Sequence, residues 1–283
     1  MRLADGFAAS GMRRIGRGCA ALIAAGALLG GCTTVNTTAP GAVGVQRSQT
    51  MTPLVASADV NRMAVQQYSQ TLKAAQQKGA LNADATETRR VRAIAQRLIP
   101  QTQVFRPDAV SWPWEINVLS SDEMNAWCMP GGKIAVYTGL IDKLALTDDE
   151  LAAVMGHEIA HALREHSREN MSRAMPAQIL LQVVGAAYGG GAQQLGGQAY
   201  QLLVGLPNSR EMETEADRIG TELMARAGYN PEAAVNVWHK MQKANQGKEQ
   251  PEILSTHPSS DSRIADLSVI AKRVEPLYEQ ARK

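Results

Sequence analysis

Residues 155–166 read MGHEIAHALREH and hold three of the chain's five histidines. Positions i and i+4 of an α-helix lie on one face, so the side chains of His157 and His161 would point the same way. Two imidazoles placed like this can bind one zinc ion, and Glu158 would reach a water on the metal rather than the metal itself. The alternative is a solvated helix with two unrelated histidines. Because histidine is scarce in this chain, the spacing favours a zinc site with Glu158 as the catalytic base.

The sequence around this motif is typical of a well-capped helix. Thr147 followed by Glu150 matches a capping box, and the two aspartates between them suit the positive end of a helix dipole. Val154, Ile159 and Leu163 would mark the buried side of the helix. The two histidines would therefore lie well inside a regular helix, which is the rigid support that a metal site needs.

Two histidines do not complete a catalytic zinc site, because three protein ligands plus water are usual. The extended motif H-E-x-x-H-x-x-G-x-x-H would place its last histidine at position 167, which is a serine. His166 is one residue out of register, so we interpret it as a helix-end residue without a metal role.

A later helix, SREMETEADRIGTELMARAG at 209–228, offers a glutamate as the third ligand. Glu213 and Asp217 lie on the border of its buried face, beside small residues that permit the close approach of another helix. A half-buried carboxylate needs a partner, and zinc would supply one for Glu213. Asp217, one turn on, could accept the spare N–H of a ligand histidine. The other charged residues follow steps of three and four and are most simply a solvated face, comprising Glu211, Glu215, Arg218, Glu222 and Arg226.

Composition and local pattern predict a mainly α fold of the α+β class. Aromatic residues make up only 4% of the chain, while Ala, Gln and Met are frequent, which favours helix. WEINVLSS at 114–121 and NAWCMPGGKIAVYTGLI at 125–141 carry β-branched and aromatic residues around a Pro-Gly-Gly turn, and they predict a small sheet. The net charge of +2 and the lack of a basic stripe argue against a nucleic-acid partner.

The amino-terminal residues predict export. Three arginines precede the apolar run CAALIAAGALLGGC at 19–32, which suits a secretory signal peptide and is too short to span a membrane. Its end resembles a bacterial lipobox, with Leu29 three residues before Cys32; the alternative is an ordinary signal peptide cut elsewhere. We therefore expect a lipoprotein signal peptide at 1–31, lipidation at Cys32, a flexible tether at 32–56 and a metallopeptidase domain at 57–283. With Thr33 rather than aspartate after the cysteine, the default destination is the periplasmic face of the outer membrane.

Two further segments invite interpretation. Residues 174–209 contain no charged residue and several glycines, and their glutamines favour a helical hairpin or flap over the site rather than a membrane hairpin. After cleavage of the signal peptide Cys128 would be the one thiol besides Cys32, so no intramolecular disulfide is expected. We interpret Cys128 as a buried small residue and His239 as a residue of a helix surface.

Four motifs in order resemble one family of enzymes. HEIAH, SREMETEAD, MPGGKIAVYTGL and THPSSDSRI are similar to those of the gluzincin metallopeptidase family of the CAAX prenyl endopeptidases, HtpX, BepA and LoiP, and the lipoprotein start is most like that of LoiP. The resemblance covers roughly residues 59–275. It implies a zincin-type helical catalytic domain with a small edge sheet and one zinc ion per chain. The ligands that it implies are His157, His161 and Glu213.

The resemblance also suggests how a peptide would bind and react. An extended peptide would pair by strand addition with an edge strand made of Gly132, Lys133, Ile134, Ala135 and Val136. His257 has three possible roles: a turn histidine before a proline, an extra metal ligand in a closed state, or a donor to the reacting oxyanion. Arg263 would hold that loop or the substrate carbonyl, or form an ordinary helix salt bridge.

The expected function is that of a zinc endopeptidase of the bacterial cell envelope, which cleaves unfolded or misassembled outer-membrane proteins as quality control. Its expected partners are unfolded protein substrates, the membrane that holds its lipid, and envelope assembly machinery or other proteases. One alternative is a protease-fold chaperone or assembly lipoprotein without significant catalysis, although such a protein has no need of Glu158. A structural zinc protein would want four closed ligands, often cysteines, and the body of the chain has one cysteine.

Overall fold

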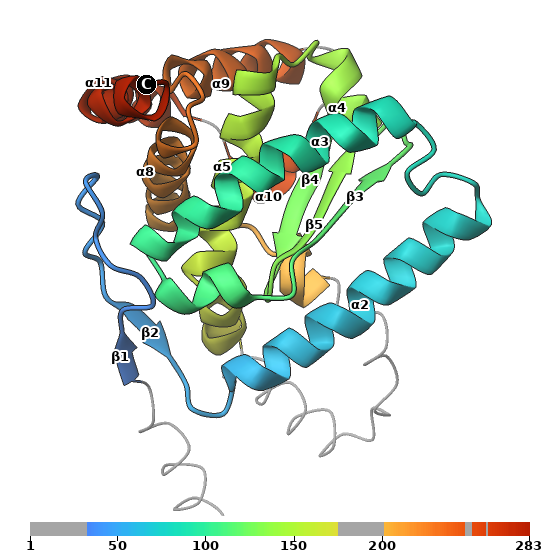
Figure 1. The fold of residues 1–283 in the computed structure, drawn as a ribbon. Coiled ribbons are helices and arrows are strands. Elements are labelled where there is room, and N and C mark those ends of the chain that lie inside the picture. Colours follow the sequence, from blue (N-terminus) through green and yellow to red (C-terminus); the bar gives the residue numbers. More distant parts are fainter. Residues whose placement is uncertain (1–32, 175–200, 247–250, 259) are drawn as a thin grey trace, which may run out of the picture.

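The computed structural model describes residues 33–174, 201–246, 251–258 and 260–283. The predicted signal peptide at 1–31, Cys32 and most of the uncharged segment 174–209 therefore lie outside the described residues. Helices dominate, and they surround one three-stranded sheet (Figure 1), so the predicted mainly α fold with a small sheet is confirmed. The longer helices are α2 (Ser57–Gln77), α3 (Ala85–Leu98), α5 (Asp148–Leu163), α8 (Arg210–Arg226), α9 (Glu232–Asn245) and α11 (Asp261–Ala281).

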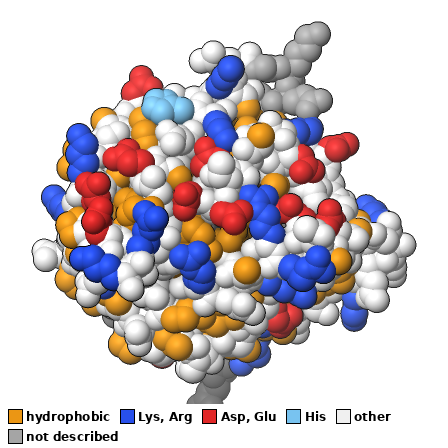
Figure 2. Space-filling model, turned by 45° about the horizontal axis from the view of Figure 1, so that its top comes forward, with side chains coloured by type: hydrophobic (Ala, Val, Ile, Leu, Met, Phe, Trp, Pro, Cys, Tyr) orange, Lys and Arg blue, Asp and Glu red, His pale blue; other side chains and the backbone are white. Residues whose placement is uncertain are grey.

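Short elements precede or connect these helices. They are β1 (Thr33–Val35), β2 (Gln49–Met51), the 3-10 helices η1 (Ile99–Val104) and η2 (Pro107–Ser111), α4 (Thr138–Lys143), the π-helix η3 (Gln201–Gly205) and α10 (Ile253–Thr256). Within the described ranges, no helix combines the length and the apolar character that crossing a bilayer requires. On the face drawn in Figure 2, acidic and basic side chains are interspersed with apolar ones.

Helices α5 and α8 cross in direct backbone contact. The capping box at the start of α5 is formed, since Thr147 accepts from the Glu150 amide at 3.3 Å and Glu150 accepts from the Thr147 amide at 2.9 Å. Further along, Gly156 faces Gly220 of α8 so closely that a Cβ on Gly220 would lie 2.6 Å from the His157 nitrogen. Two glycines thus let the helices touch, and this contact brings α8 onto the face of α5 that carries the histidines.

The sheet consists of β3 (Glu115–Leu119), β5 (Lys133–Tyr137) and β4 (Ala126–Met129), in that order. Strand β5 pairs in parallel with β3 and antiparallel with β4, so it is the central strand. The predicted hairpin is present, with Gly131 and Gly132 in the left-handed region at its turn.

The prediction that residues 132–136 form the edge strand is wrong. All five residues of β5 are buried, as its unbroken apolar run would favour in a central strand. The Lys133 ammonium donates to the Pro113 carbonyl at 2.5 Å and contacts Glu115 at 2.5 Å, so it is directed toward the β3 side of the sheet. The edge strands of the described sheet are β3 and β4; β3 packs against α3, and β4 packs against α5 beside the histidines.

The prediction of a flexible tether before the body is also wrong for the residues that the structure describes. We call residues 33–56 the N-terminal strap; it is drawn in blue beside α8 in Figure 1. Its strands β1 and β2 pair with each other, and Val43 and Val45 are buried in the main hydrophobic core. The Val43 amide donates to the buried Glu222 carboxylate at 3.0 Å. Burial of these valines and pairing of buried charges hold the strap on the body.

Candidate metal centre

Four side chains converge between α5, α8 and α10. They are His157 and His161 of α5, Glu213 of α8 and His257, which directly follows α10; each offers one donor atom, and all four donor atoms lie within 4.8 Å of one another. His157 Nε2 is 3.0 Å from His161 Nε2 and 3.2 Å from His257 Nδ1. Glu213 Oε1 is 3.0 Å from His257 Nδ1 and 3.4 Å from His161 Nε2. All four residues are buried.

These distances fit a zinc ion. Zinc bonds of about 2.0–2.1 Å in a tetrahedron place neighbouring donor atoms about 3.3–3.4 Å apart. The four separations given above, at 3.0–3.4 Å, lie close to that spacing, and all four donor atoms lie within 4.8 Å of one another. Three imidazoles and one carboxylate are also a donor set that zinc accepts. The residues present therefore fit the metal.

The charges around the donor atoms favour a cation. Burial works against a charge on His157, yet its interactions with Asp217 and Glu213 outweigh burial and raise its pKa to about 9 in the metal-free chain. Burial also works against ionisation of Glu213, but the neighbouring histidines, His257 first, hold the pKa of this carboxyl well below its usual value. Burial keeps the pKa of His161 well below normal. The site thus offers an ionised carboxylate and a neutral imidazole, and it attracts positive charge.

Asp217 and Arg263 support one side of this donor set. Asp217 Oδ1 lies 3.0 Å from His157 Nδ1. The contact brings the two charges together, although the angle at the His157 N–H is poor for a hydrogen bond. Arg263 donates to both oxygens of Asp217 at 2.7 Å, and its Nη1 lies 2.8 Å from Glu213 Oε2. Arg263 also donates to the Pro258 carbonyl at 2.8 Å. The prediction that Arg263 holds the His257 loop agrees with this bond. Its ion pairs with Asp217 and Glu213 are an additional feature of the structure.

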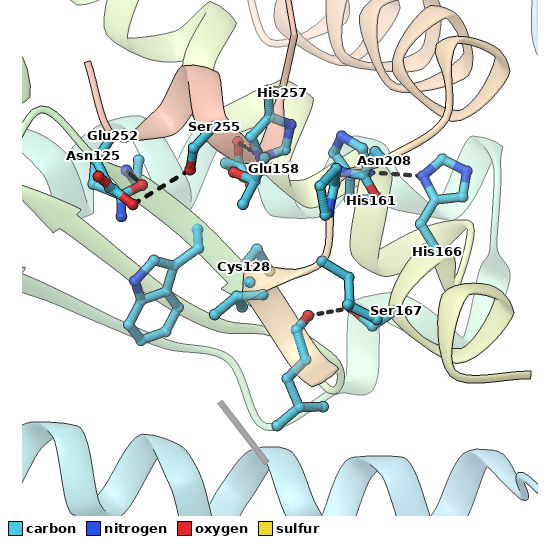
Figure 3. A pocket seen from close by; sticks show the side chains of 18 of the residues that line it. Asn125, Cys128, Glu158, His161, His166, Ser167, Asn208, Glu252, Ser255 and His257 are labelled. Atoms are coloured by element: carbon cyan, nitrogen blue, oxygen red, sulfur yellow. Dashed lines mark hydrogen bonds and ion pairs between the residues drawn. The ribbon is translucent and has the colours of Figure 1, made fainter. Parts of the chain in front are cut away.

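His166 and Glu215 support the other side, and the sequence reading missed both. His166 Nδ1 lies 2.8 Å from His161 Nδ1, and His166 Nε2 lies 3.0 Å from Glu215 Oε2. His166 and Glu215 are buried, so the prediction of a solvated face for Glu215 is wrong, as it is for the fully buried Glu222. Glu165, at φ 51°, turns the chain after α5, and this turn points His166 back toward His161 (Figure 3).

Glu158 lies at the wall of a cavity beside the donor set. Burial raises the pKa of its carboxyl, and its Oε1 has no hydrogen-bond partner among the described residues. Glu158 Oε1 is 3.6 Å from His257 Nε2, and the nearby Cys128 amide of β4 partly offsets the effect of burial on the pKa of Glu158. A buried carboxyl with a raised pKa and an unpaired oxygen is suited to move a proton.

The cavity is large enough for a peptide segment. Its volume is about 800 Å³, and strand β4, η3 and α10 contribute to its walls. Trp127 and Cys128 line it from β4, and Asn208 and Ser255 line it from other segments (Figure 3). Cys128 is a free, buried thiol, as expected. Because β4 is an edge strand that also touches Glu158, this cavity is where an extended chain could meet the proposed base.

His257 takes the position that would complete a four-donor set. Its Nδ1 lies 3.2 Å from His157 Nε2 and 3.0 Å from Glu213 Oε1. This geometry corresponds to the closed arrangement expected as one of its roles. Donation to an oxyanion by His257 stays a prediction.

The fold and this site define a metallopeptidase of the class that uses HExxH and a distant glutamate. The model of peptidase family M48 matches residues 85–271, and the chain belongs to that family. Peptidases of this family use zinc, which agrees with the donor set.

Relatives with known names support this assignment. The mitochondrial metalloendopeptidase OMA1 of Saccharomyces cerevisiae is 36% identical over 175 residues, which are 59% of this chain and 50% of that protein. OMA1 of Arabidopsis thaliana is 40% identical over 150 residues, which are 53% of this chain and 30% of that protein. The Escherichia coli (strain K12) beta-barrel assembly-enhancing protease is 29% identical over 210 residues, which are 70% of this chain and 42% of that protein. The matched part of the chain thus spans half or less of each of these relatives.

Proposed function

We propose that this chain is a zinc-dependent endopeptidase of the bacterial cell envelope that cleaves unfolded or misassembled membrane proteins. The observation that carries the proposal is the position of Glu158. This buried carboxyl, one of whose oxygens accepts no hydrogen bond from the described residues, lies beside a four-donor metal site and on the wall of a cavity of about 800 Å³. A protein that kept the fold only as a chaperone would have no use for a base at that place.

The residues divide the work of peptide hydrolysis among them. His157, His161 and Glu213 would hold the zinc ion, which acts as a Lewis acid toward a carbonyl and acidifies a water. Glu158 would take a proton from the attacking water and return it to the leaving amine. Asp217 would keep the spare N–H of His157 engaged, so that His157 Nε2 remains free to bind the metal.

Strand β4 supports a preference for unfolded chains. An extended peptide that adds to the β4 edge is held through its backbone, so its side chains are read loosely. Folded proteins cannot offer such a strand without local unfolding. The name of the E. coli relative, a beta-barrel assembly-enhancing protease, supports membrane proteins and their assembly machinery as substrates and partners.

We expect the purified protein to cleave unfolded casein and to lose this activity when a zinc chelator is added. Cleavage should return when zinc is restored, because the donor set is preformed by α5 and α8. The measurement is the formation of casein fragments over time, with a stably folded protein as the control substrate. If casein stays intact while its aggregation is suppressed, the chaperone alternative replaces the protease.

The anchor is a separate part of the proposal. The lipobox-like LLGGC and Thr33 support lipidation at Cys32 and the periplasmic face of the outer membrane. Two or more acyl chains, at about 0.8 kcal/mol per buried CH₂, would hold the protein stably.

The wild-type protein should pellet with outer membranes and take up labelled fatty acid, whereas Cys32→Ser should do neither. Cys19→Ser, a matched change within the same apolar run, should behave as wild type. A soluble and unlabelled wild type would remove the anchor and leave the metal chemistry untouched.

A further inference from the structure

A chain of contacts fixes the tautomer of His161. The carboxylate of Glu215 can only accept a hydrogen bond, so the 3.0 Å contact to His166 Nε2 puts the proton on that nitrogen. An imidazole that donates from Nε2 carries its acceptor lone pair on the other ring nitrogen, Nδ1. The 2.8 Å contact between the two Nδ1 atoms therefore places the proton of His161 on its Nδ1. His161 Nε2 is left with its lone pair directed into the donor set, as a metal ligand requires.

Two arginines hold Glu215 in place. Arg164, the residue after α5, contacts both carboxylate oxygens at 3.0 Å. Arg47 of the N-terminal strap contacts them at 2.7 and 3.0 Å. Burial opposes the charge on Glu215, but hydrogen bonds from His166 and Arg47 and the charge of Arg164 lower the pKa of its carboxyl to about 2. Such bidentate charged pairs are strong and fix orientation as well as distance.

The N-terminal strap is itself held firmly at this point. Arg47 also binds both oxygens of Glu169, at 2.7 and 2.9 Å, and its carbonyl accepts from Arg164 at 2.8 Å. Gln49 of β2 donates to the Arg164 carbonyl and to Glu169. Arg47 is therefore a partly buried residue whose guanidinium is held by two buried acids, Glu169 and Glu215.

The two ligand histidines of α5 are thus supported from different parts of the chain. The partner of His157 is Asp217, which Arg263 of α11 holds. The partner of His161 is His166. His166 is held by Glu215, and Glu215 is held in turn by Arg47, which lies 168 positions before Glu215 in the sequence. Only the second support involves the N-terminal strap.

We propose that the N-terminal strap completes the outer support of the metal site, with Arg47 acting as a positioning residue for His161 through Glu215 and His166. The inference rests on the proposed zinc site and adds a part of the chain that the family match, which begins at residue 85, does not include. An intact strap is then a condition for tight metal binding.

The test measures zinc affinity of the full chain by competition with a chromogenic chelator. His166→Phe should weaken zinc binding by about 100-fold and Arg47→Gln by about 10-fold, the upper and lower ends for outer partners of a metal ligand. The double variant Arg47→Gln/His166→Phe should bind zinc no more weakly than His166→Phe alone, because Arg47 acts through His166. Independent effects would multiply to about 1,000-fold and would overturn the proposal.

A matched control separates this role from general stability. Arg218→Gln breaks another bidentate arginine–carboxylate pair of α8, with Asp266, and should leave zinc affinity unchanged. Should Arg47→Gln fail to fold, Arg47→Lys keeps the charge but not the bidentate contact, and its zinc affinity should fall between those of wild type and His166→Phe. Wild-type affinity in every strap variant overturns the inference alone, whereas a wild-type chain that binds no zinc overturns the proposed function.

Discussion

Replacing Glu158 with glutamine should reduce peptide hydrolysis by about 100- to 10,000-fold, the usual contribution of a general base, and leave zinc bound. Glutamine has the same shape but cannot take a proton from water. The donor set does not include Glu158, whose carboxylate lies beside it at the cavity wall. The measurement is the casein cleavage rate together with the zinc content of the same preparation.

Glu150→Gln provides a control on the same helix. Glu150 closes the capping box of α5 and pairs with Lys240 at 2.7 Å, so this change should cost about 1 kcal/mol of stability and retain activity. A wild-type rate in Glu158→Gln would sink the assignment of the base. Loss of zinc in that variant would instead make Glu158 a ligand.

Glu213→Ala should lose zinc, with an affinity drop beyond about 100-fold, the upper end for residues that only support a ligand. The change removes the one carboxylate of the donor set. It also leaves Arg263 with one acid instead of two. Metal content after dialysis and casein cleavage should fall together.

Glu211→Ala is the matched control for this substitution, because Glu211 is an exposed glutamate in the first turn of the same helix. It should keep the metal and the activity. Equal zinc loss in both variants would refute the assignment of Glu213. Glu215 is unsuitable as a neutral control, since it is buried and binds His166.

Local spacing was sufficient to predict the donors that α5 and α8 contribute. The capping box at Thr147 and the i, i+4 spacing of two histidines depend only on helix geometry. Glu213 followed from the border of an amphipathic face, and the structure places it against both histidines. Such features are encoded within a few residues and survive in the fold.

Features that depend on distant segments could not be predicted in the same way. The hairpin of β4 and β5 was visible in the sequence, but the side on which β3 adds decides which strand is the edge. Likewise, Glu215 lies in a periodic charged series that would suit solvent. Its burial depends on Arg47, and the irregular strap that carries Arg47 has no periodic pattern to reveal it.

His166 shows a third kind of failure. Its register excluded it as a ligand, and that part of the reasoning is compatible with the structure, where it contacts His161 and not the four donor atoms. The left-handed turn at Glu165 brings it back, and a glutamate gives no signal of such a conformation in sequence.

With His257 among the donor atoms, as in this structure, we expect the folded chain to be latent. A peptide carbonyl would reach the donor set only after His257 withdraws. His257 follows α10, a single turn of helix whose bonds to the rest of the chain include those from the Ile253 amide to the Met124 carbonyl and from the Asn208 amide to the Thr256 carbonyl. A latent chain would leave neighbouring proteins intact. Its rate of peptide hydrolysis would then be set by substrate chains able to displace His257, and not by the number of enzyme molecules present.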